Sequence, residues 1–134
     1  MGFLYLLDTN IVSDLIRNPA GRAAQRVAEI GEEAVCTSII VACELRFGAE
    51  KKNSDSLRNR VEELLSILEI FPLSGEVDRE YARIRTRMES AGTPIGPNDL
   101  LIAAQALSLG LVLVTANTTE FSRVSGLQVE NWLA

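Results

Sequence analysis

The 134-residue sequence contains no histidine. Without histidine, neither a Ser-His-Asp nor a Cys-His catalytic triad can be built. A His-based acid–base pair and a His-ligated zinc site are excluded as well. Any enzymatic chemistry must therefore rest on carboxylates, on Lys and Arg, or on a metal ion held by oxygen atoms.

Aromatic residues and positive charges are also scarce. Aromatic side chains make up 5% of the sequence, so a broad platform for stacking nucleic-acid bases is not expected. The 13 basic residues are outnumbered by 18 acidic ones, which leaves a net charge of −5. This balance argues against tight binding of nucleic acid through charge alone.

Long apolar runs and closely spaced cysteines are missing too. No apolar run approaches the roughly 20 residues of a membrane span, and residues 1–7 lack the flanking features of a signal peptide. Cys36 and Cys43 are seven residues apart, which matches neither a redox pair nor a zinc knuckle. We therefore expect a cytoplasmic protein without a membrane partner, in which both cysteines are small buried thiols.

The apolar content, 47% of the residues, is enough for a buried core, and the length suits a single domain over residues 1–134. Short apolar runs predict strands at 3–7, 34–36, 70–73, 111–115 and 128–130, with Pro72 favouring a sheet edge for the third. Helical spacing of apolar residues predicts helices at 9–17, 20–30, 39–47, 54–68, 76–91 and 97–108. This alternation is typical of a three-layer α/β/α fold with a mainly parallel central sheet.

Several acidic and amide side chains stand at the ends of these elements. Asp8 and Asn117 follow apolar strands, and Asp99 begins a helix, so all three are expected at the carboxyl edge of the sheet. Glu44 lies beside the apolar stripe of its helix, where a buried carboxylate requires a partner or a metal ion.

Each of these residues also has a simpler interpretation. Asp8 can cap the following helix, and Asp99 can complement a helix dipole. Glu44 can pair with a nearby Arg46 or Lys51, and Asn117 can be an ordinary turn residue. Taken together, however, oxygen ligands at one edge suit Mg²⁺ or Mn²⁺, and crowded carboxylates repel one another unless a cation neutralises them.

Six segments of the chain resemble a known family. They are Leu-Asp-Thr-Asn at 7–10, Cys-Glu-Leu at 43–45, Phe-Gly-Ala at 47–49, Pro-Asn-Asp-Leu-Leu-Ile-Ala at 97–103, Thr-Ala-Asn at 115–117 and Asn-Trp at 131–132. Their types and order resemble the motifs of PIN-domain ribonucleases, and more closely those of the VapC toxins of bacterial toxin–antitoxin pairs. The resemblance covers essentially the whole chain.

The resemblance implies a role for each matching residue. Asp8, Glu44 and Asp99 would be catalytic residues and ligands of Mg²⁺ or Mn²⁺. Asn117 would complete the catalytic set, at a position where many members carry a fourth acid. The residues expected to support the site are Asn10, Thr115 and Glu120, and Glu120, one helical turn after Asn117, is a candidate substitute for the missing acid.

The resemblance also implies an activity and partners. The expected reaction is metal-dependent hydrolysis of RNA, with transfer RNA a frequent substrate in the family, leaving 5′-phosphate and 3′-hydroxyl ends. The expected partners are a VapB-type antitoxin, whose Arg-bearing segment would neutralise the carboxylates, and a second copy in a homodimer. A higher assembly would form with the antitoxin.

The candidate RNA-binding residues are four of the arginines. Arg79, Arg83 and Arg87 are spaced four apart and so share one helix face, and Arg46 belongs to a second basic group. We interpret these four as a phosphate-binding track. The alternative is a solvated face with local pairs to neighbouring glutamates.

Three other functions remain alternatives. A phosphatase of the haloacid dehalogenase type needs Asp-x-Asp after the first strand, where this chain has Asp8-Thr9-Asn10. A receiver-like signalling module needs an Asp ending the third strand and a Lys after a later strand, but the only lysines are Lys51 and Lys52. A catalytically weak PIN domain that only binds RNA or protein is left open by Asn117.

Overall fold

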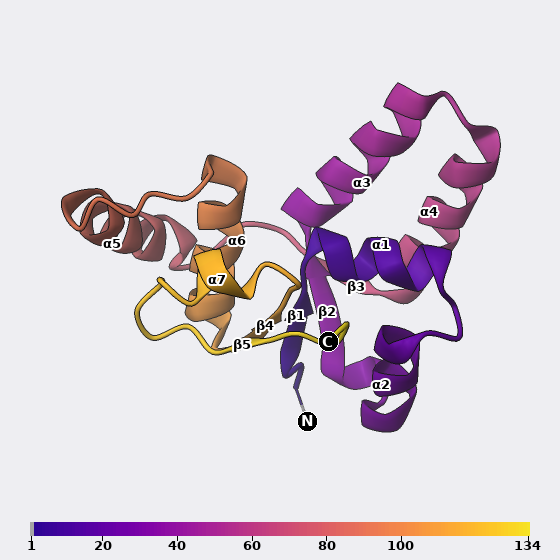
Figure 1. Ribbon diagram of the computed structural model, residues 1–134, viewed down its shortest axis with the longest axis horizontal. Coiled ribbons are helices and arrows are strands. Elements are labelled where there is room, and N and C mark those ends of the chain that lie inside the picture. Colours follow the sequence, from indigo (N-terminus) through magenta and orange to yellow (C-terminus); the bar gives the residue numbers. More distant parts are fainter. Residues whose placement is uncertain (1) are drawn as a thin grey trace.

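Five short parallel strands form the centre of the fold (Figure 1). The computed structural model describes residues 2–134, so Met1, which the expected domain includes, lies outside the described residues. The strands are β1 (Tyr5–Leu7), β2 (Val35–Ser38), β3 (Glu69–Phe71), β4 (Val112–Val114) and β5 (Val129–Glu130), in the spatial order β3-β2-β1-β4-β5. Leu7 at the end of β1 pairs with Thr37 and with Val114, so the carboxyl ends of the three central strands meet.

Helices cover both sides of this sheet. They are α1 (Thr9–Arg17), α2 (Arg22–Ile30), α3 (Ile39–Lys52), α4 (Asp55–Ile67), α5 (Val77–Ser90), α6 (Pro97–Leu109) and α7 (Thr118–Phe121), with a 3₁₀ turn at Glu32–Ala34. In Figure 1 the pair α3 and α4 projects to one side, and the pair α5 and α6 lies on the other. The predicted α/β fold with a parallel sheet flanked by helices is confirmed, and β3 lies at the edge that Pro72 indicated.

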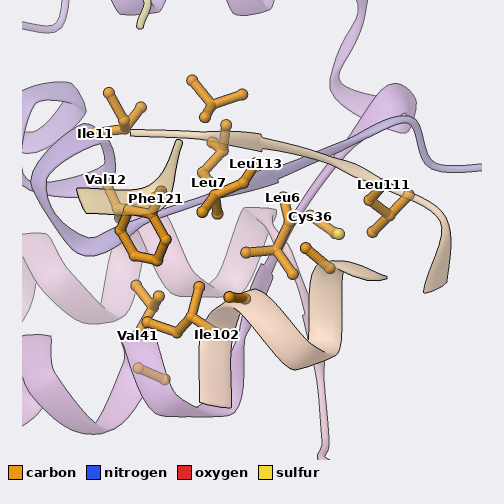
Figure 2. Close-up of a cluster of buried hydrophobic side chains, with 14 of the residues drawn as sticks. Leu6, Leu7, Ile11, Val12, Cys36, Val41, Ile102, Leu111, Leu113 and Phe121 are labelled. Atoms are coloured by element: carbon orange, nitrogen blue, oxygen red, sulfur yellow. The ribbon is translucent and has the colours of Figure 1, made fainter. Parts of the chain in front are cut away.

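The core explains why β1 is a continuous apolar run. Successive side chains of a strand point to opposite faces, yet Leu6 and Leu7 are both fully buried. Leu113, Ile102 and Phe121 are fully buried in the same cluster (Figure 2). Each such side chain contributes about 1.5–3 kcal/mol by leaving water, so β1 and the residue that follows it are firmly placed.

The structure corrects two expectations about α3. Cys43 is exposed and only Cys36 is buried, because adjacent residues of a helix point to different sides. The helix also continues beyond the predicted end at residue 47 and through Gly48 to Lys52, and Asn53 caps it in the left-handed conformation (φ 51°). A glycine inside a helix costs only about 1 kcal/mol, which packing of α3 against α4 outweighs.

The other predicted helix and strand ends agree with the structure to within two residues, whereas the short helix α7 and the 3₁₀ turn were not predicted. Helix α2, for instance, begins at Arg22 because Gly21 is its N-cap. None of the helices within residues 2–134 is long and apolar enough to cross a membrane.

Candidate active site

Asp8 lies directly after β1 and is only 4% exposed. Its Oδ1 accepts a hydrogen bond of 2.8 Å from the Thr9 N–H, and its Oδ2 accepts one of 2.8 Å from the Thr115 hydroxyl. Burial raises the pKa of Asp8, the two hydrogen bonds oppose that rise, and the negative charge of Glu44 adds to it. Asp8 also caps α1, as its simpler interpretation predicted. Capping the helix does not prevent Asp8 from belonging to the acidic group.

Asn10 and Thr115 connect Asp8 to the loop after β4. The Asn10 side-chain amide donates to Asp8 Oδ2 at 3.4 Å and to the Thr115 hydroxyl at 3.3 Å. Asn10 Oδ1 accepts from the Ala116 N–H at 2.9 Å, and the Thr115 hydroxyl accepts from the Asn117 N–H at 3.0 Å. Both residues therefore contact the carboxylate that they were predicted to support.

Glu44 reaches the same region from α3. Its Oε1 accepts a hydrogen bond of 2.6 Å from the Thr9 hydroxyl. The predicted alternative, an ion pair with Arg46 or Lys51, is wrong: Arg46 makes two hydrogen bonds of 2.9 Å to Glu62 instead, and Lys51 makes no ion pair within residues 2–134. Thr9 is a contact that the sequence analysis missed, and the only signal was its position between Asp8 and Asn10.

Asp99 is the third residue of α6, which begins with Pro97. Burial raises the pKa of Asp99 to about 6, and the negative charges of Asp8, Glu120 and Glu44 add to the rise. The charges of Asp8, Glu44 and Glu120 thus all act on Asp99, and the charge of Glu44 also acts on Asp8, so these acids share one region of negative charge. None of the four takes part in an ion pair within residues 2–134.

The loop after β4 contributes two further candidate residues. Asn117 immediately precedes α7, and in the described part of the chain only its backbone makes a hydrogen bond. Glu120, one helical turn later, is near enough to raise the pKa of Asp99. An acid whose charge acts on Asp99 is thus present one turn after Asn117.

The donor chemistry of this group fits a hard divalent cation. Carboxylate oxygens are the ligands that Mg²⁺ and Mn²⁺ prefer, and four repelling carboxylates without a basic partner favour a bound cation. No three Cys, Asp or Glu side chains within residues 2–134 already converge closely enough to hold a metal ion. The acids therefore lie around one region but do not form a complete set of metal ligands in the described chain.

Comparisons with known proteins place this chain in a family. Residues 5–127 match the PIN domain model. The tRNA(fMet)-specific endonuclease VapC of Shigella flexneri is 35% identical over 130 residues, which are 96% of this chain and 97% of that protein. The chain belongs to the VapC ribonuclease family of PIN domains. Ribonuclease VapC2 of Rickettsia felis is 36% identical over 131 residues, 96% of this chain and 98% of its own length.

Solved structures of this family agree with the fold. VapBC2 from Rickettsia felis, bound to a DNA fragment from its promoter, superposes with a TM-score of 0.88 at 34% identity, covering 97% of this chain and 99% of that one. VapBC-1 from nontypeable Haemophilus influenzae gives 0.85 at 32% identity, covering 98% and 100%. PIN-domain nucleases generally depend on divalent metal ions, which agrees with the carboxylate group of this VapC family member.

The predicted RNA-binding arginines are mostly held by local partners. Arg79 lies 3.7 Å from Glu76, Arg83 lies 3.1 Å from Glu80, and Arg46 is bound to Glu62. Arg87 differs, because it is exposed and makes no ion pair within the described residues. Three of the four arginines therefore form ion pairs with glutamates, as the alternative interpretation predicted.

Proposed function

We propose that this chain is a divalent-metal-dependent endoribonuclease, the toxin of a VapBC-type pair, built as a single PIN domain over residues 1–134. The observation that carries the proposal is the group of Asp8, Glu44, Asp99 and Glu120: the first, second and fourth of these carboxylates all act on the charge of Asp99, and none of the four has a basic partner in the described chain. The family supports the reaction type, because its curated members carry the name ribonuclease.

In this proposal Asp8, Glu44 and Asp99 hold Mg²⁺ or Mn²⁺, and Glu120 or Asn117 completes the set. A bound cation of this kind activates water and stabilises the charge of a reacting phosphate. The chain's own groups orient the acids: the Thr9 amide and the Thr115 hydroxyl hold Asp8, and the Thr9 hydroxyl holds Glu44. Burial and neighbouring negative charge raise the pKa of Asp99 to about 6, so its carboxylate is mostly ionised at neutral pH and would be available to hold the cation.

The proposed substrate is RNA, with transfer RNA as the first to test. The Shigella flexneri relative is named for a transfer RNA. Arg46, Arg79, Arg83 and Arg87 are proposed to contact phosphates. The unpaired Arg87 is ready to do so, whereas the other three must exchange a glutamate for a phosphate.

The proposed protein partners are a VapB-type antitoxin and a second copy of the chain. Relatives of similar fold have been solved as VapBC complexes. Four carboxylates without a basic partner would be neutralised by an Arg-bearing antitoxin segment as well as by a cation. Host toxicity that a co-expressed VapB-type protein relieves would support this assignment, and toxicity that it leaves unchanged would contradict it.

The direct test of the reaction is cleavage of total transfer RNA by the purified chain. We expect cleavage with Mg²⁺ or Mn²⁺, none with EDTA, and none by Asp8→Ala or Asp99→Ala. Asp78→Asn, which alters an exposed acid on α5, should cleave normally. Cleavage that survives EDTA or either active-site substitution would contradict the proposal, and RNA binding without cleavage by the wild type would favour the binding module that Asn117 leaves open.

A further inference from the structure

Phe47 is an exposed aromatic side chain beside the acidic group. Its side chain is 66% exposed, more than the other exposed large hydrophobic residues of the described chain. It lies three residues after Glu44 on α3, and side chains at this spacing are neighbours on a helix surface. An aromatic ring therefore stands in solvent one turn from a proposed metal ligand.

A lysine lies over the face of this ring. The Lys51 ammonium lies 6.0 Å from the ring centroid, over its face. Within residues 2–134, neither Lys51 nor Lys52 makes an ion pair. Lys52 lines a cavity of about 190 Å³ that Glu44 also borders. One unpaired cation thus lies over the ring, and a second borders the cavity that Glu44 also lines.

We propose that Phe47 stacks against a base of the RNA substrate while Lys51 contacts a neighbouring phosphate. The inference rests on the proposed ribonuclease function and adds a substrate-positioning residue to it. Every base offers a π-face to an aromatic ring, so such a stack needs no particular sequence. The scarcity of aromatics excludes a broad platform but leaves room for this single contact.

The surroundings of Phe47 favour RNA over a protein partner. The interior of a protein interface is poor in Lys and Glu, yet the neighbours of Phe47 on this face of α3 include Glu44 and Lys51. None of the other exposed large hydrophobic residues of the described chain lies on α3: Ile67 is on α4, Leu109 is on α6, and Leu4 and Leu73 lie outside the helices and strands. An aromatic ring together with a nearby cation is the combination by which proteins commonly bind single-stranded nucleic acid, whereas a single exposed ring is a small part of the roughly 800 Å² that each side of a stable protein interface buries.

The first test compares cleavage by Phe47→Ala, Phe47→Leu and Phe47→Trp. We expect KM to rise about 5- to 100-fold for the Ala and Leu variants, with kcat changed by no more than about twofold, and the Trp variant to retain wild-type KM. Leu109→Ala, at an exposed apolar position on α6, serves as the control and should leave KM unchanged. A Leu variant as active as the Trp variant would overturn the proposal, because it would show that apolar contact suffices.

The second test observes stacking directly in an inactive background. In the double variant Asp99→Asn, Phe47→Trp, we expect oligoadenylate to quench the fluorescence of the new tryptophan and inorganic polyphosphate to leave it unchanged. Equal quenching by both would overturn the proposal, because it would reflect charge alone. The signal is read against Asp99→Asn, which retains Trp132 as its only tryptophan.

Cys43 provides a third measurement without altering Phe47. It is exposed one turn before Phe47, whereas Cys36 is buried and burial raises its pKa to about 12, so alkylation reports on Cys43. We expect oligoadenylate to slow alkylation of Asp99→Asn. Protection that depends on protein concentration and not on RNA would overturn the proposal in favour of a second copy on this face.

The outcomes separate the two levels of the proposal. A wild-type chain that neither cuts nor binds RNA would overturn both the ribonuclease function and the role of Phe47. Normal RNA cleavage with unchanged KM in Phe47→Ala would overturn the role of Phe47 alone.

Discussion

The hydroxyl of Thr9 donates a hydrogen bond of 2.6 Å to Oε1 of Glu44, joining the start of α1 to α3 across 35 positions of sequence. Thr9 also donates its backbone N–H to Asp8, so one residue orients two carboxylates from different elements. A neutral donor can do this without supplying positive charge. The negative charge of the site therefore remains available to a cation.

Replacing Thr9 with Val should weaken the site without disturbing the fold. The substitution removes the hydroxyl and keeps the branched shape, so Glu44 loses the bond that orients it. Losing such a supporting contact typically costs about 10- to 100-fold in metal affinity or activity. We expect kcat/KM to fall by about that factor, and Thr9→Ser to restore it.

The control is Thr86→Val, which removes an exposed hydroxyl bonded to the Ala82 carbonyl and should leave kcat/KM unchanged. Equal activity of Thr9→Val and wild type would contradict the prediction.

Thr115 and Thr37 form a matched pair for testing the support of Asp8. Both are fully buried; the Thr115 hydroxyl donates to Asp8 at 2.8 Å, and the Thr37 hydroxyl donates to the Leu7 carbonyl at 2.7 Å. Replacing either with Val should lower the free energy of unfolding by about 1–3 kcal/mol, because a buried acceptor loses its donor. Only Thr115→Val should raise the pKa of Asp8 further and reduce cleavage.

The measurements for this pair are urea unfolding and the pH profile of kcat/KM. We expect the acidic limb of the profile to move to higher pH in Thr115→Val and to stay in place in Thr37→Val. Identical profiles for the two variants would show that the Thr115 hydroxyl matters only for stability.

Asp99 should make the cation-free protein less stable at neutral pH. Its pKa is about 6 in the folded chain against an ordinary value of 3.8. Between these values the folded state binds more protons than the unfolded state, so stability falls as pH rises through this window and the loss is complete above about pH 6. Asp99→Asn should therefore raise the free energy of unfolding at pH 7 by about 1–2 kcal/mol, since partial exposure screens the effect, with little gain at about pH 4.

The same variant should lose its response to divalent cations. A ligand that binds only the folded state raises the melting temperature, so Mn²⁺ should stabilise the wild type at pH 7 and have little effect on Asp99→Asn. Urea unfolding at several pH values checks the predicted pH dependence of stability, and thermal melts with and without Mn²⁺ check the predicted loss of cation binding. An Asp99→Asn protein with the pH dependence and Mn²⁺ response of the wild type would contradict both predictions.

Much of this site could be predicted from the ends of the apolar segments. Asp8 directly follows a run that is buried on both faces, and Asp99 follows Pro97 at a helix start, so each position depends on local structure. Glu44 was harder to place, because its approach to Asp8 depends on how α3 packs against α1. No local signal encodes that packing.

The wrong prediction for Cys43 has the same origin. Its apolar neighbours in sequence indicated burial, but on a helix each residue is turned about 100° from the last, and Ala42 is buried while Cys43 is exposed. The local pairing of Arg46 with Glu62 likewise depends on α3 and α4 lying side by side. The sequence patterns therefore predicted the helices and strands, but not the contacts between them.

Glu120 and Asn117 should contribute differently to the site. The charge of Glu120 raises the pKa of Asp99, whereas the Asn117 side chain carries no charge. Glu120→Gln should therefore lower the pKa of Asp99 toward its ordinary value and weaken Mn²⁺ binding, while Asn117→Ala should leave that pKa in place. Calorimetric titration with Mn²⁺ and carboxyl titration by NMR check this, and a larger loss of Mn²⁺ affinity in Asn117→Ala would assign the fourth position to Asn117.

Arg87 should contribute more to RNA binding than Arg83, although both lie on α5. Arg83 makes two hydrogen bonds to Glu80, of 3.1 and 3.2 Å, whereas Arg87 is exposed and unpaired among residues 2–134. A phosphate must displace Glu80 to reach Arg83, so its net gain there is small.

Each phosphate contact on a single strand adds about 0.7 to the slope of log affinity against log salt concentration. Arg87→Gln should remove about that much of the slope, and Arg83→Gln clearly less. Fluorescence anisotropy of a labelled oligoribonucleotide with the Asp99→Asn protein, at salt concentrations from about 50 to 200 mM, measures both slopes. Equal slopes in the two variants would contradict the idea that local ion pairs decide which arginines bind RNA, because the two residues share a helix and differ chiefly in their partners.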